Sequence, residues 1–410
     1  MKFGKLALAA AAMAATPLLA QDAVSDKEPL VPQEITFSAE GLGGEGANAL
    51  SEAIADAQFI VVGEDHGFAD APILIAGLAA ESGEAGFDIY AVETGPMSAD
   101  WLVEALESGG ADLLAGKLEG RPLSIPFLGM REEAEVAAMF LKQGRIWGID
   151  QEFIGSPLIH FEILADGASD TQSELVAILL ERERTAFASG NQGAVFFMAG
   201  TDEEWLALRQ AFAGEDAKLA RIAAMERSAA IYRHYVTGRG LDNNLDRIAL
   251  IREYFLEAYH AHAEEHGSPP KVLMKLGATH AGRSTSPMAT FDIGSLVEGM
   301  AAANGMDALH IAYFPMGGEQ TAIRPSPDGF FIRKPVEGDK VRALLEKAGV
   351  DLTPIDASEG HFVIAMEPVK RALRNKGLQE LDPMTRFVVL GFDYLITTSK
   401  GRPNTPLAEK

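Results

Sequence analysis

The sequence predicts an α/β protein with a mostly parallel, mixed sheet, helices on both faces of that sheet and a helical insertion. Three observations predict this fold class. Short runs rich in Val and Ile alternate with helical patterns along the chain. These runs are apolar along their whole length, which is typical of strands buried on both faces. One long segment is helical in pattern throughout and heavily charged.

Two pairs of helix and strand begin the pattern. Residues 46–57 have helical apolar spacing, and residues 58–66 form an apolar run that predicts a buried strand. Residues 70–84 suit an amphipathic helix with Asp70 as its N-cap and a proline in its first turn. Residues 87–93 predict the second strand.

The later part of the chain adds four strands and one long helical segment. The four strands are predicted at residues 145–150, 271–277, 308–314 and 386–396, the first of them after a stretch with helical character around 97–142. Because helical patterns fill the interval between the third and fourth strands, we predict a discontinuous core of residues 21–157 and 267–410. Residues 158–266 are then a helical insertion that caps this core.

The first twenty residues resemble a secretory signal peptide. Lys2 and Lys5 precede an apolar stretch, Leu6 to Ala20, that is rich in Ala and Leu. This stretch is shorter than the roughly 20 apolar residues of a membrane-spanning helix. We therefore expect residues 1–20 to be cleaved, with no stable membrane anchor left, and the mature protein to be periplasmic or secreted.

Composition excludes several classes of function. The 410 residues carry a formal net charge of −24, which disfavours binding to nucleic acid or to an anionic membrane surface. With no cysteine, the chain has no disulfide, no thiol nucleophile, no iron–sulfur cluster and no lipid anchor on cysteine. Any metal would be held by His, Asp and Glu, and the expected partner is a small-molecule substrate.

Ionisable side chains gather where the predicted strands end. Ligands of open α/β sheets bind outside the carboxyl ends of the strands, because loops and helix N-termini converge there. The residues that follow the first four predicted strands are Glu64 and His66, Glu93, Asp150, and His280 with Arg283. Both His66 and His280 stand in a G-x-x-H frame, so we expect them to share one site.

Missing motifs restrict the chemistry of such a site to the activation of water. The chain has no G-x-S-x-G elbow, no Walker loop and no G-x-G-x-x-G after the first strand. In one mode His66 is the general base, oriented by Glu64 or Glu93, while His280 and Arg283 stabilise the oxyanion. In the other mode a divalent metal bound by His66, Glu93 and His280, with Glu64 as a further candidate ligand, lowers the pKa of a bound water molecule. The sequence leaves both modes open.

Structural interpretations compete for some of these residues. Asp150 also suits the cap of a following helix, and Glu152 a solvated position. Three further histidines, His260, His262 and His266, are close in sequence, but only the last two share a helix face. We interpret these three as a solvated helix end.

The order of the motifs resembles the erythromycin esterase-like superfamily, which also takes in ChaN-type haem-binding lipoproteins and, more distantly, the TraB/Tiki group. The shared order is an apolar strand, G-E-x-H-G, a helix, a strand ending in AVETGP, a helical middle and a strand followed by a second His. Further pieces that resemble the superfamily are residues 145–153, 251–259, 271–283 and 391–406.

The resemblance implies a set of site residues. The active-site positions would be Glu64, His66, Glu93 and His280, with His66 as the base that activates water and Arg252 and Arg283 as secondary candidates. Apart from the resemblance, we expect Arg252 and Asp150 to bind the substrate. Two departures concern substrate and metal. One residue separates Glu64 from His66 where the esterases generally have two, and GATH replaces an Asn-containing pattern before His280. The shorter spacing is closer to the ChaN and TraB/Tiki forms, and together the two departures disfavour a macrolide lactone as substrate and favour the metal mode.

We therefore expect an exported hydrolase that cleaves an ester, lactone or related acyl bond with His-activated water and needs no cofactor. One alternative is a metal-dependent peptidase or amidase of the TraB/Tiki type, with Zn or Mn at His66, Glu93 and His280. The other is a ChaN-like protein that binds haem or iron without catalysis. The substrate and the oligomeric state stay open.

Overall fold

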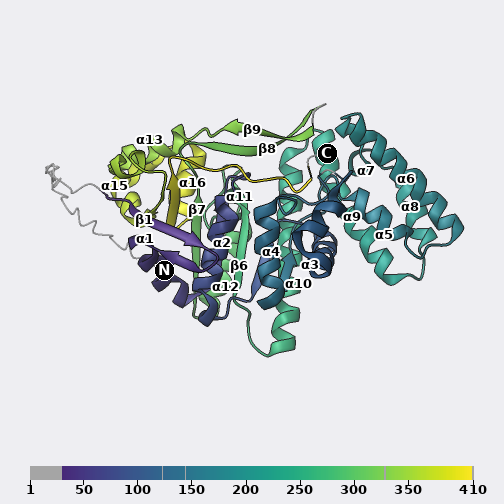
Figure 1. Cartoon of the computed structure of the whole chain (residues 1–410), viewed down its shortest axis with the longest axis horizontal. Helices are drawn as coiled ribbons and strands as arrows, with labels where there is room; N and C mark the ends of the chain where they lie inside the picture. The colour runs from purple at the N-terminus through teal and green to yellow at the C-terminus, as the bar shows by residue number, and fades with distance from the viewer. Residues whose placement is uncertain (1–29, 122, 144, 327–328, 409–410) are drawn as a thin grey trace, which may run out of the picture.

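A computed structural model describes residues 30–121, 123–143, 145–326 and 329–408. A sheet lies between two layers of helices, and a helical bundle extends the molecule at one end, on the right of Figure 1. The predicted signal peptide, residues 1–20, lies outside the described residues. Within them, no helix has both the length and the apolar character needed to cross a bilayer.

The main sheet has nine strands in the order β2-β1-β10-β11-β7-β3-β6-β4-β5. From β11 to β5 all neighbours are parallel, whereas the pairs at the β2 edge are antiparallel. The parallel strands are β3 (Ala57–Glu64), β4 (Ile89–Val92), β5 (Arg145–Gly148), β6 (Val272–Gly277), β7 (Asp307–Tyr313) and β11 (Tyr394–Thr398). The other three are β1 (Gln33–Ser38), β2 (Gly41–Gly43) and β10 (His361–Ala365). The predicted fold class, a mostly parallel mixed sheet, is confirmed.

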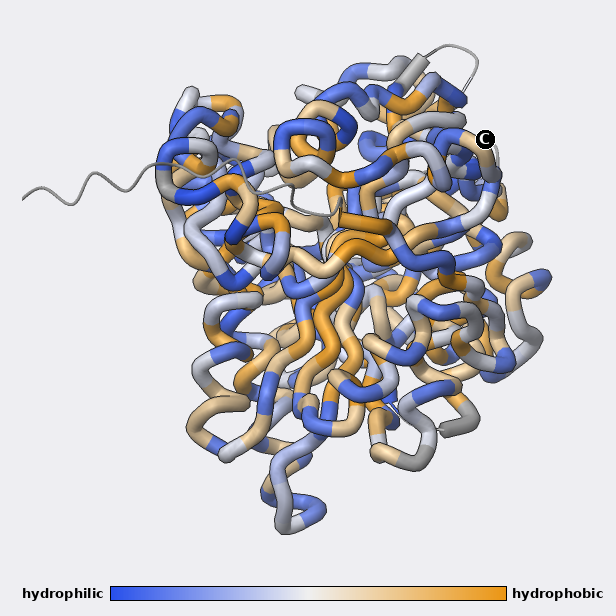
Figure 2. The backbone as a smooth tube through the Cα atoms, turned by 90° about the vertical axis from the view of Figure 1, so that its left-hand side faces the viewer, coloured by the Kyte–Doolittle hydropathy of each residue, from blue (hydrophilic) through white to orange (hydrophobic). Residues whose placement is uncertain are grey.

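Helices cover both faces of this sheet, so its central strands are buried, as the apolar runs predict. One apolar core joins the sheet to α1 (Glu45–Asp56), α2 (Asp70–Glu81), α3 (Pro96–Leu118) and α4 (Arg131–Gln143). The core on the opposite face contains side chains of α10 (Gly240–His266), α12 (Ile293–Ala303), α13 (Asp339–Ala348), α15 (Met366–Gln379) and α16 (Pro383–Gly391). In Figure 2 the strands form an apolar band through the middle of the molecule. Short elements complete the core: the 3-10 helix η1 (Gly83–Ala85), α11 (Ala278–Ala281) and α14 (Thr353–Asp356).

The segment predicted as a helical insertion forms a bundle with an apolar core of its own. Its elements before α10 are α5 (Pro157–Ala165), α6 (Asp170–Ala188), η2 (Gln192–Ala194), α7 (Phe196–Ala199), α8 (Asp202–Ala211) and α9 (Asp216–Val236). Phe161, Phe196 and Trp205 are fully buried in its core. Two helix starts have capping boxes, at Ser169 for α6 and Thr201 for α8, in which the cap side chain accepts the N–H three residues on.

A two-stranded ribbon, β8 (Glu319–Ser326) and β9 (Gly329–Pro335), connects the core with the bundle. It runs along the top of Figure 1 from the region of α13 towards α7. The rings of Phe330 and Phe187 lie 5.9 Å apart, and Phe331 also packs against the core of the bundle. The sequence did not predict this ribbon, because polar and charged residues interrupt its apolar pattern.

Two local predictions are wrong. Residues 386–391, predicted as the start of a strand, belong to α16, because Asp382 caps that helix by accepting the backbone N–H groups of Met384 and Thr385. Asp70 is the first residue of α2 and not its N-cap. Its buried carboxylate instead accepts hydrogen bonds from Arg402.

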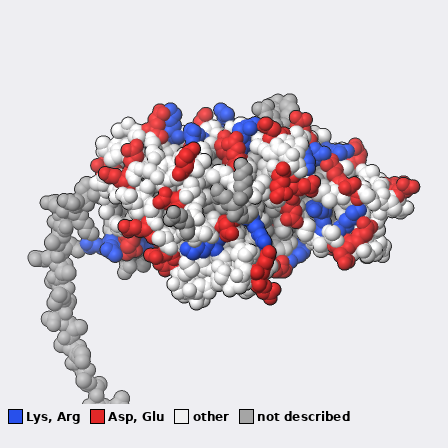
Figure 3. Space-filling model, turned by 60° about the horizontal axis from the view of Figure 1, so that its bottom comes forward, with Lys and Arg blue, Asp and Glu red and all other residues white. Residues whose placement is uncertain are grey.

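Acidic side chains are spread over the surface. On the face shown in Figure 3, Asp and Glu lie over all parts of the molecule, and Lys and Arg stand among them singly or in small groups. The exclusion of nucleic acid and of anionic membranes stays a prediction from the net charge of −24.

Candidate active site

The carboxyl ends of three adjacent strands bring four predicted site residues together. Glu64 ends β3 and His66 follows it, Glu93 follows β4, and His280 lies in α11 directly after β6. Because β6 pairs with both β3 and β4, the three loops that carry these residues are neighbours. The strand pairing therefore gathers residues that are more than 200 positions apart in the sequence.

Glu93 is at the centre of the group. Its Oε2 atom lies 3.7 Å from His66 Nε2, and its Oε1 atom lies 4.0 Å from His280 Nε2. The backbone N–H of Gly277 donates to Oε2. A Cβ atom on Gly277 would lie 2.9 Å from His66 Nε2, so the close approach of the imidazole requires glycine here. Both imidazoles thus face one buried carboxylate from two sides.

His66 is held so that one ring nitrogen is tied and the other is directed into the site. Nδ1 lies 3.0 Å from Glu64 Oε1, and the ring stacks on Phe127 with a centroid distance of 3.7 Å. The side chain is 30% exposed, whereas that of Glu64 is 1% exposed. Burial acts to lower the pKa of His66, but Glu93 and Glu64 outweigh it and raise that pKa above its usual value.

His280 has a carboxylate partner of its own. Its Nδ1 lies 2.7 Å from Asp292 Oδ2, while Oδ1 of Asp292 accepts the N–H of Ile293 at the start of α12. Burial and the charge of Arg247 act to lower the pKa of His280, but Asp292 and Glu93 outweigh them and raise it. Asp292, which caps α12, therefore also orients the imidazole of His280 and favours its protonated form.

Arg247 is the main cation of the site, and sequence reasoning missed it. This residue of α10 donates to Glu93 Oε1 at 2.8 Å and to Asp150 Oδ1 at 2.9 Å, with a further bond to Asp150 Oδ2. Burial acts to raise the pKa of Glu93, but His66, Arg247 and His280 together hold it well below its usual range. Helical spacing contained a signal for this role, because Arg247 lies four residues before the fully buried Ile251.

The remaining predicted residues have different places. Asp150 is buried and binds Arg247, so it does not cap a helix. Arg252 donates to the carbonyl groups of Phe291 and Asp292 and so supports the loop before α12.

The structure does not bring Arg283 to Glu93. After α11 the chain turns away from the strand ends, and the Arg283 guanidinium donates to Asp393 and to the carbonyl of Ala308, near the start of β7. With Asp393 it lines a separate hollow of about 540 Å³. The predicted contribution of Arg283 to an oxyanion site therefore has no support in this geometry.

A second cation, Lys275 of β6, was also missed. Its side chain is 4% exposed, and its Nζ donates to Glu64 and, at 2.8 Å, to Glu133 Oε1 of α4. The signal was a single lysine inside the apolar run VLMKLG. A buried lysine needs anionic partners, which here are these two carboxylates.

Both oxygens of the central carboxylate already accept hydrogen bonds from the protein. Among the residues that the structure describes, no group of three or more His, Asp and Glu side chains is placed to hold a metal ion. One oxygen of Glu93 accepts from Gly277 and the other from Arg247, whose positive charge also disfavours a nearby cation. His66 and His280 lie 3.7 and 4.0 Å from Glu93, and the metal-binding mode stays a prediction.

Two other predicted positions are structural. Glu152 is buried and not solvated: it accepts from Met97 N–H at 2.9 Å and from His160 Nε2 at 3.0 Å, which links α3 to α5. The rings of His262 and His266 stack at 4.0 Å, and His266 Nδ1 is bonded to the carbonyl of His262. These last contacts hold two turns of one helix together.

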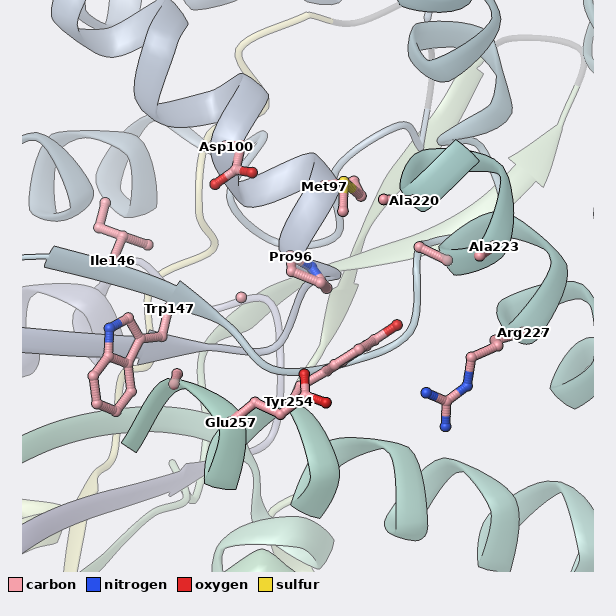
Figure 4. A pocket seen from close by; sticks show the side chains of 13 residues that line it. Pro96, Met97, Asp100, Ile146, Trp147, Ala220, Ala223, Arg227, Tyr254 and Glu257 are labelled. Carbon is pink, nitrogen blue, oxygen red and sulfur yellow. The ribbon is translucent and has the colours of Figure 1, made fainter. Parts of the chain in front are cut away.

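A separate hollow of about 490 Å³ lies between β5, the start of α3, α9 and α10 (Figure 4). Trp147, Tyr254 and several alanines line it, and the carboxylates of Asp100 and Glu257 lie at its border. None of the predicted site residues is part of its lining. Size alone therefore does not identify the candidate active site, which rests on its ionisable groups.

Comparison with known proteins places the fold. No protein-family model and no curated protein matches the sequence. A solved structure of a mutant of the erythromycin esterase EreC in its open conformation aligns with a TM-score of 0.60 at 14% identity, covering 92% of this chain and 99% of the esterase. A succinoglycan biosynthesis protein aligns with a TM-score of 0.52 at 13% identity, covering 91% and 95% of the two chains. The chain therefore has an erythromycin esterase-like fold, which confirms the predicted resemblance at the level of the fold.

Proposed function

We propose that this protein is an exported hydrolase that cleaves an ester, lactone or related acyl bond of a small molecule with water activated by His66. One observation carries the proposal. His66 and His280 approach opposite oxygens of Glu93 at 3.7 and 4.0 Å, and each has its other ring nitrogen bonded to a further carboxylate. Two oriented imidazoles beside one carboxylate are suited to proton transfer to and from a reacting group.

The first step uses His66 as a general base. Its Nδ1–H donates to Glu64, which leaves the lone pair on Nε2 to take a proton from water. The water oxygen then forms a bond to the acyl carbon, and the carbonyl π electrons move to the carbonyl oxygen. Glu64 and Glu93 both stabilise the imidazolium that results, since both favour the protonated form of His66.

The second step needs a hydrogen-bond donor for the oxyanion and a proton for the leaving group. His280 in its protonated form can donate from Nε2, because Asp292 holds its Nδ1–H. When the tetrahedral intermediate collapses, the bond to the leaving oxygen breaks, and the His66 imidazolium returns its proton to that oxygen. Arg247 stays bonded to Glu93 and Asp150 and so holds the central carboxylate in place.

A panel of esters, lactones, amides and peptides, assayed with wild type and His66→Ala, tests this proposal. We expect cleavage of one or more esters or lactones, unaffected by chelator, and a loss of at least about 100-fold in His66→Ala. His234→Ala is the matched control, because His234 lies in the helical bundle and pairs with Asp246 at 2.8 Å. Activity retained in His66→Ala would refute the mechanism.

The same panel separates the alternatives. Peptide or amide cleavage that is lost with chelator and restored by stoichiometric Zn or Mn would support a metal-dependent peptidase or amidase. A Soret band on titration with haem, without turnover of any substrate, would support a binding protein. Export is tested by cell fractionation and by the N-terminal sequence of the mature protein, which we expect to begin near residue 21.

A further inference from the structure

A buried cluster of charges adjoins the candidate active site on the side of the sheet that packs on α4. Lys275 lies on the central strand β6, opposite Val62 of β3 and Val92 of β4. Its Nζ bonds Glu64 Oε1 and Glu133 Oε1, and all three side chains are at most 4% exposed. Two carboxylates therefore share a single ammonium group inside the core.

Hydrogen bonding in this cluster is incomplete. Three buried oxygen atoms of the cluster and its neighbour Tyr90 have no hydrogen-bond partner, namely Glu64 Oε2, Glu133 Oε2 and the Tyr90 hydroxyl. Buried polar atoms nearly always have a partner. Apolar side chains of similar size would stabilise the core as well as a buried ion pair does. Stability alone thus does not account for these residues.

The connection to the site is one oxygen atom. Glu64 Oε1 accepts from Lys275 Nζ and also lies 3.0 Å from His66 Nδ1. The charged groups that face His66 are Glu64 from β3, its own neighbour Asp65, Glu93 after β4 and Lys275 from β6. The carboxylates favour the protonated imidazole, whereas Lys275 disfavours it. Glu133 offsets the charge of Lys275.

We propose that Lys275 and Glu133 are positioning residues that act through the shared oxygen of Glu64 to set how readily His66 accepts a proton. This inference rests on the proposed role of His66 as the general base. Burial raises the pKa of Glu133 to about 7, although Lys275 acts against that rise. In its ionised form Glu133 offsets the charge of Lys275, and this makes His66 the stronger base.

Titration of His66 by NMR tests the proposal without any substrate. The signal is followed in protein with ¹³C-labelled histidine and is identified by its loss in His66→Gln. We expect the pKa of His66 to fall in Glu133→Gln and to rise in Lys275→Met, each by about half a unit or more. The double variant removes one charge of each sign and so leaves the net charge near Glu64 unchanged, and we expect the two shifts largely to cancel. Once a substrate is known, the acidic limb of the pH–rate profile should move in the same directions.

Glu183→Gln is the matched control. Glu183 is a fully buried glutamate of α6 in the helical bundle, and burial raises its pKa to about 7 as well. We expect this variant to leave the His66 titration unchanged. Unchanged His66 titration in folded Glu133→Gln, or shifts of the same sign in both single variants, would overturn the proposal. If Lys275→Met does not fold, the direction of the shift in Glu133→Gln decides alone. If the protein cleaves no ester, the proposed function is refuted, but the NMR titration of His66 needs no substrate and still tests the effect of Lys275 and Glu133.

Discussion

Replacing Arg247 by Leu removes the only side chain that bonds both Glu93 and Asp150 in the described part of the site. The two carboxylates are buried, with 7% and 5% of their side chains exposed, and Arg247 itself is 25% exposed. Breaking a buried ion pair from one side costs about 3–5 kcal/mol, because it leaves an uncompensated charge in a medium of low polarity. His66 and His280 still stabilise Glu93, so we expect the lower end, about 3 kcal/mol, which is a change of more than 100-fold in the unfolding equilibrium constant.

Arg227→Leu is the matched control. Arg227 of α9 bonds both oxygens of Glu253 at 2.6 and 2.7 Å, but both side chains are nearly half exposed. Because water screens this surface pair, its loss should cost about 0–1 kcal/mol. The two variants remove the same kind of side chain from helices of the same region. The difference between them therefore measures burial.

Urea denaturation at several pH values is the assay. The pKa of Glu93 is depressed in the folded protein, so the stability it contributes is present above its unfolded pKa of about 4.3 and is lost as pH falls towards the folded pKa. The destabilisation in Arg247→Leu should therefore be largest above pH ~5 and shrink below it. A loss under about 1 kcal/mol at pH 7, equal to that of Arg227→Leu, would show that Arg247 does not neutralise a buried site.

Three further predictions concern the imidazoles. Since the pKa of His66 is raised, activity should increase with pH through an inflection above about 6.5, which a rate–pH profile measures. The stability that protonated His66 contributes should be present below about pH 6.5 and lost as pH rises through the folded pKa, which urea denaturation at several pH values measures. Gly277→Ala places a Cβ atom 2.9 Å from His66 Nε2 and should reduce kcat by about 10-fold or more, whereas Gly116→Ala, where no atom lies within 4 Å of the new Cβ, should leave activity unchanged. Asp292→Asn keeps a capping side chain for α12 but removes the charge that favours protonated His280. We therefore expect kcat to fall by about 10- to 100-fold while the melting temperature changes little. A large fall in the melting temperature together with the loss of kcat would contradict this role of Asp292.

The sequence was sufficient to predict the parallel sheet and the groups at its strand ends. The apolar runs FIVV (59–62) and VLMKLG (272–277), the second interrupted by Lys275, are typical of strands at the centre of a covered sheet. Once those strands were predicted, the position of Glu64, Glu93 and His280 at one edge followed from the general geometry of α/β proteins. The antiparallel strand β1 and the ribbon β8–β9 were not predicted, because polar and charged residues interrupt their apolar pattern, and β10 was not predicted because its apolar run FVIA is short.

Tertiary context decided the remaining differences. The run from Arg386 to Gly391 is apolar and β-branched enough to suggest a strand, yet the capped start at Asp382 and Pro383 makes it helical. Arg283 follows His280 by three residues, but the extended backbone at Gly282 directs the chain away from the site. Proximity in sequence was a poor guide there, because the Arg283 side chain pairs with Glu298 of α12 and with Asp393 and not with Glu93.

The charge balance of the site explains which residues were predictable and which were not. The acids Glu64, Glu93 and Asp150 end or follow strands, so the strand pattern locates them. Their counter-charges are Arg247, on the inward face of a helix, and Lys275, inside a strand. Each of these cations is buried because it pairs with a buried carboxylate, which the local sequence does not show. Buried carboxylates at adjacent strand ends repel one another and would take up protons unless cations are supplied. Such a group of acids therefore predicts buried cations elsewhere in the chain, and the candidates are the Arg and Lys residues that interrupt an apolar face. In this chain that rule selects Arg247, four residues before Ile251, and Lys275, between Met274 and Leu276.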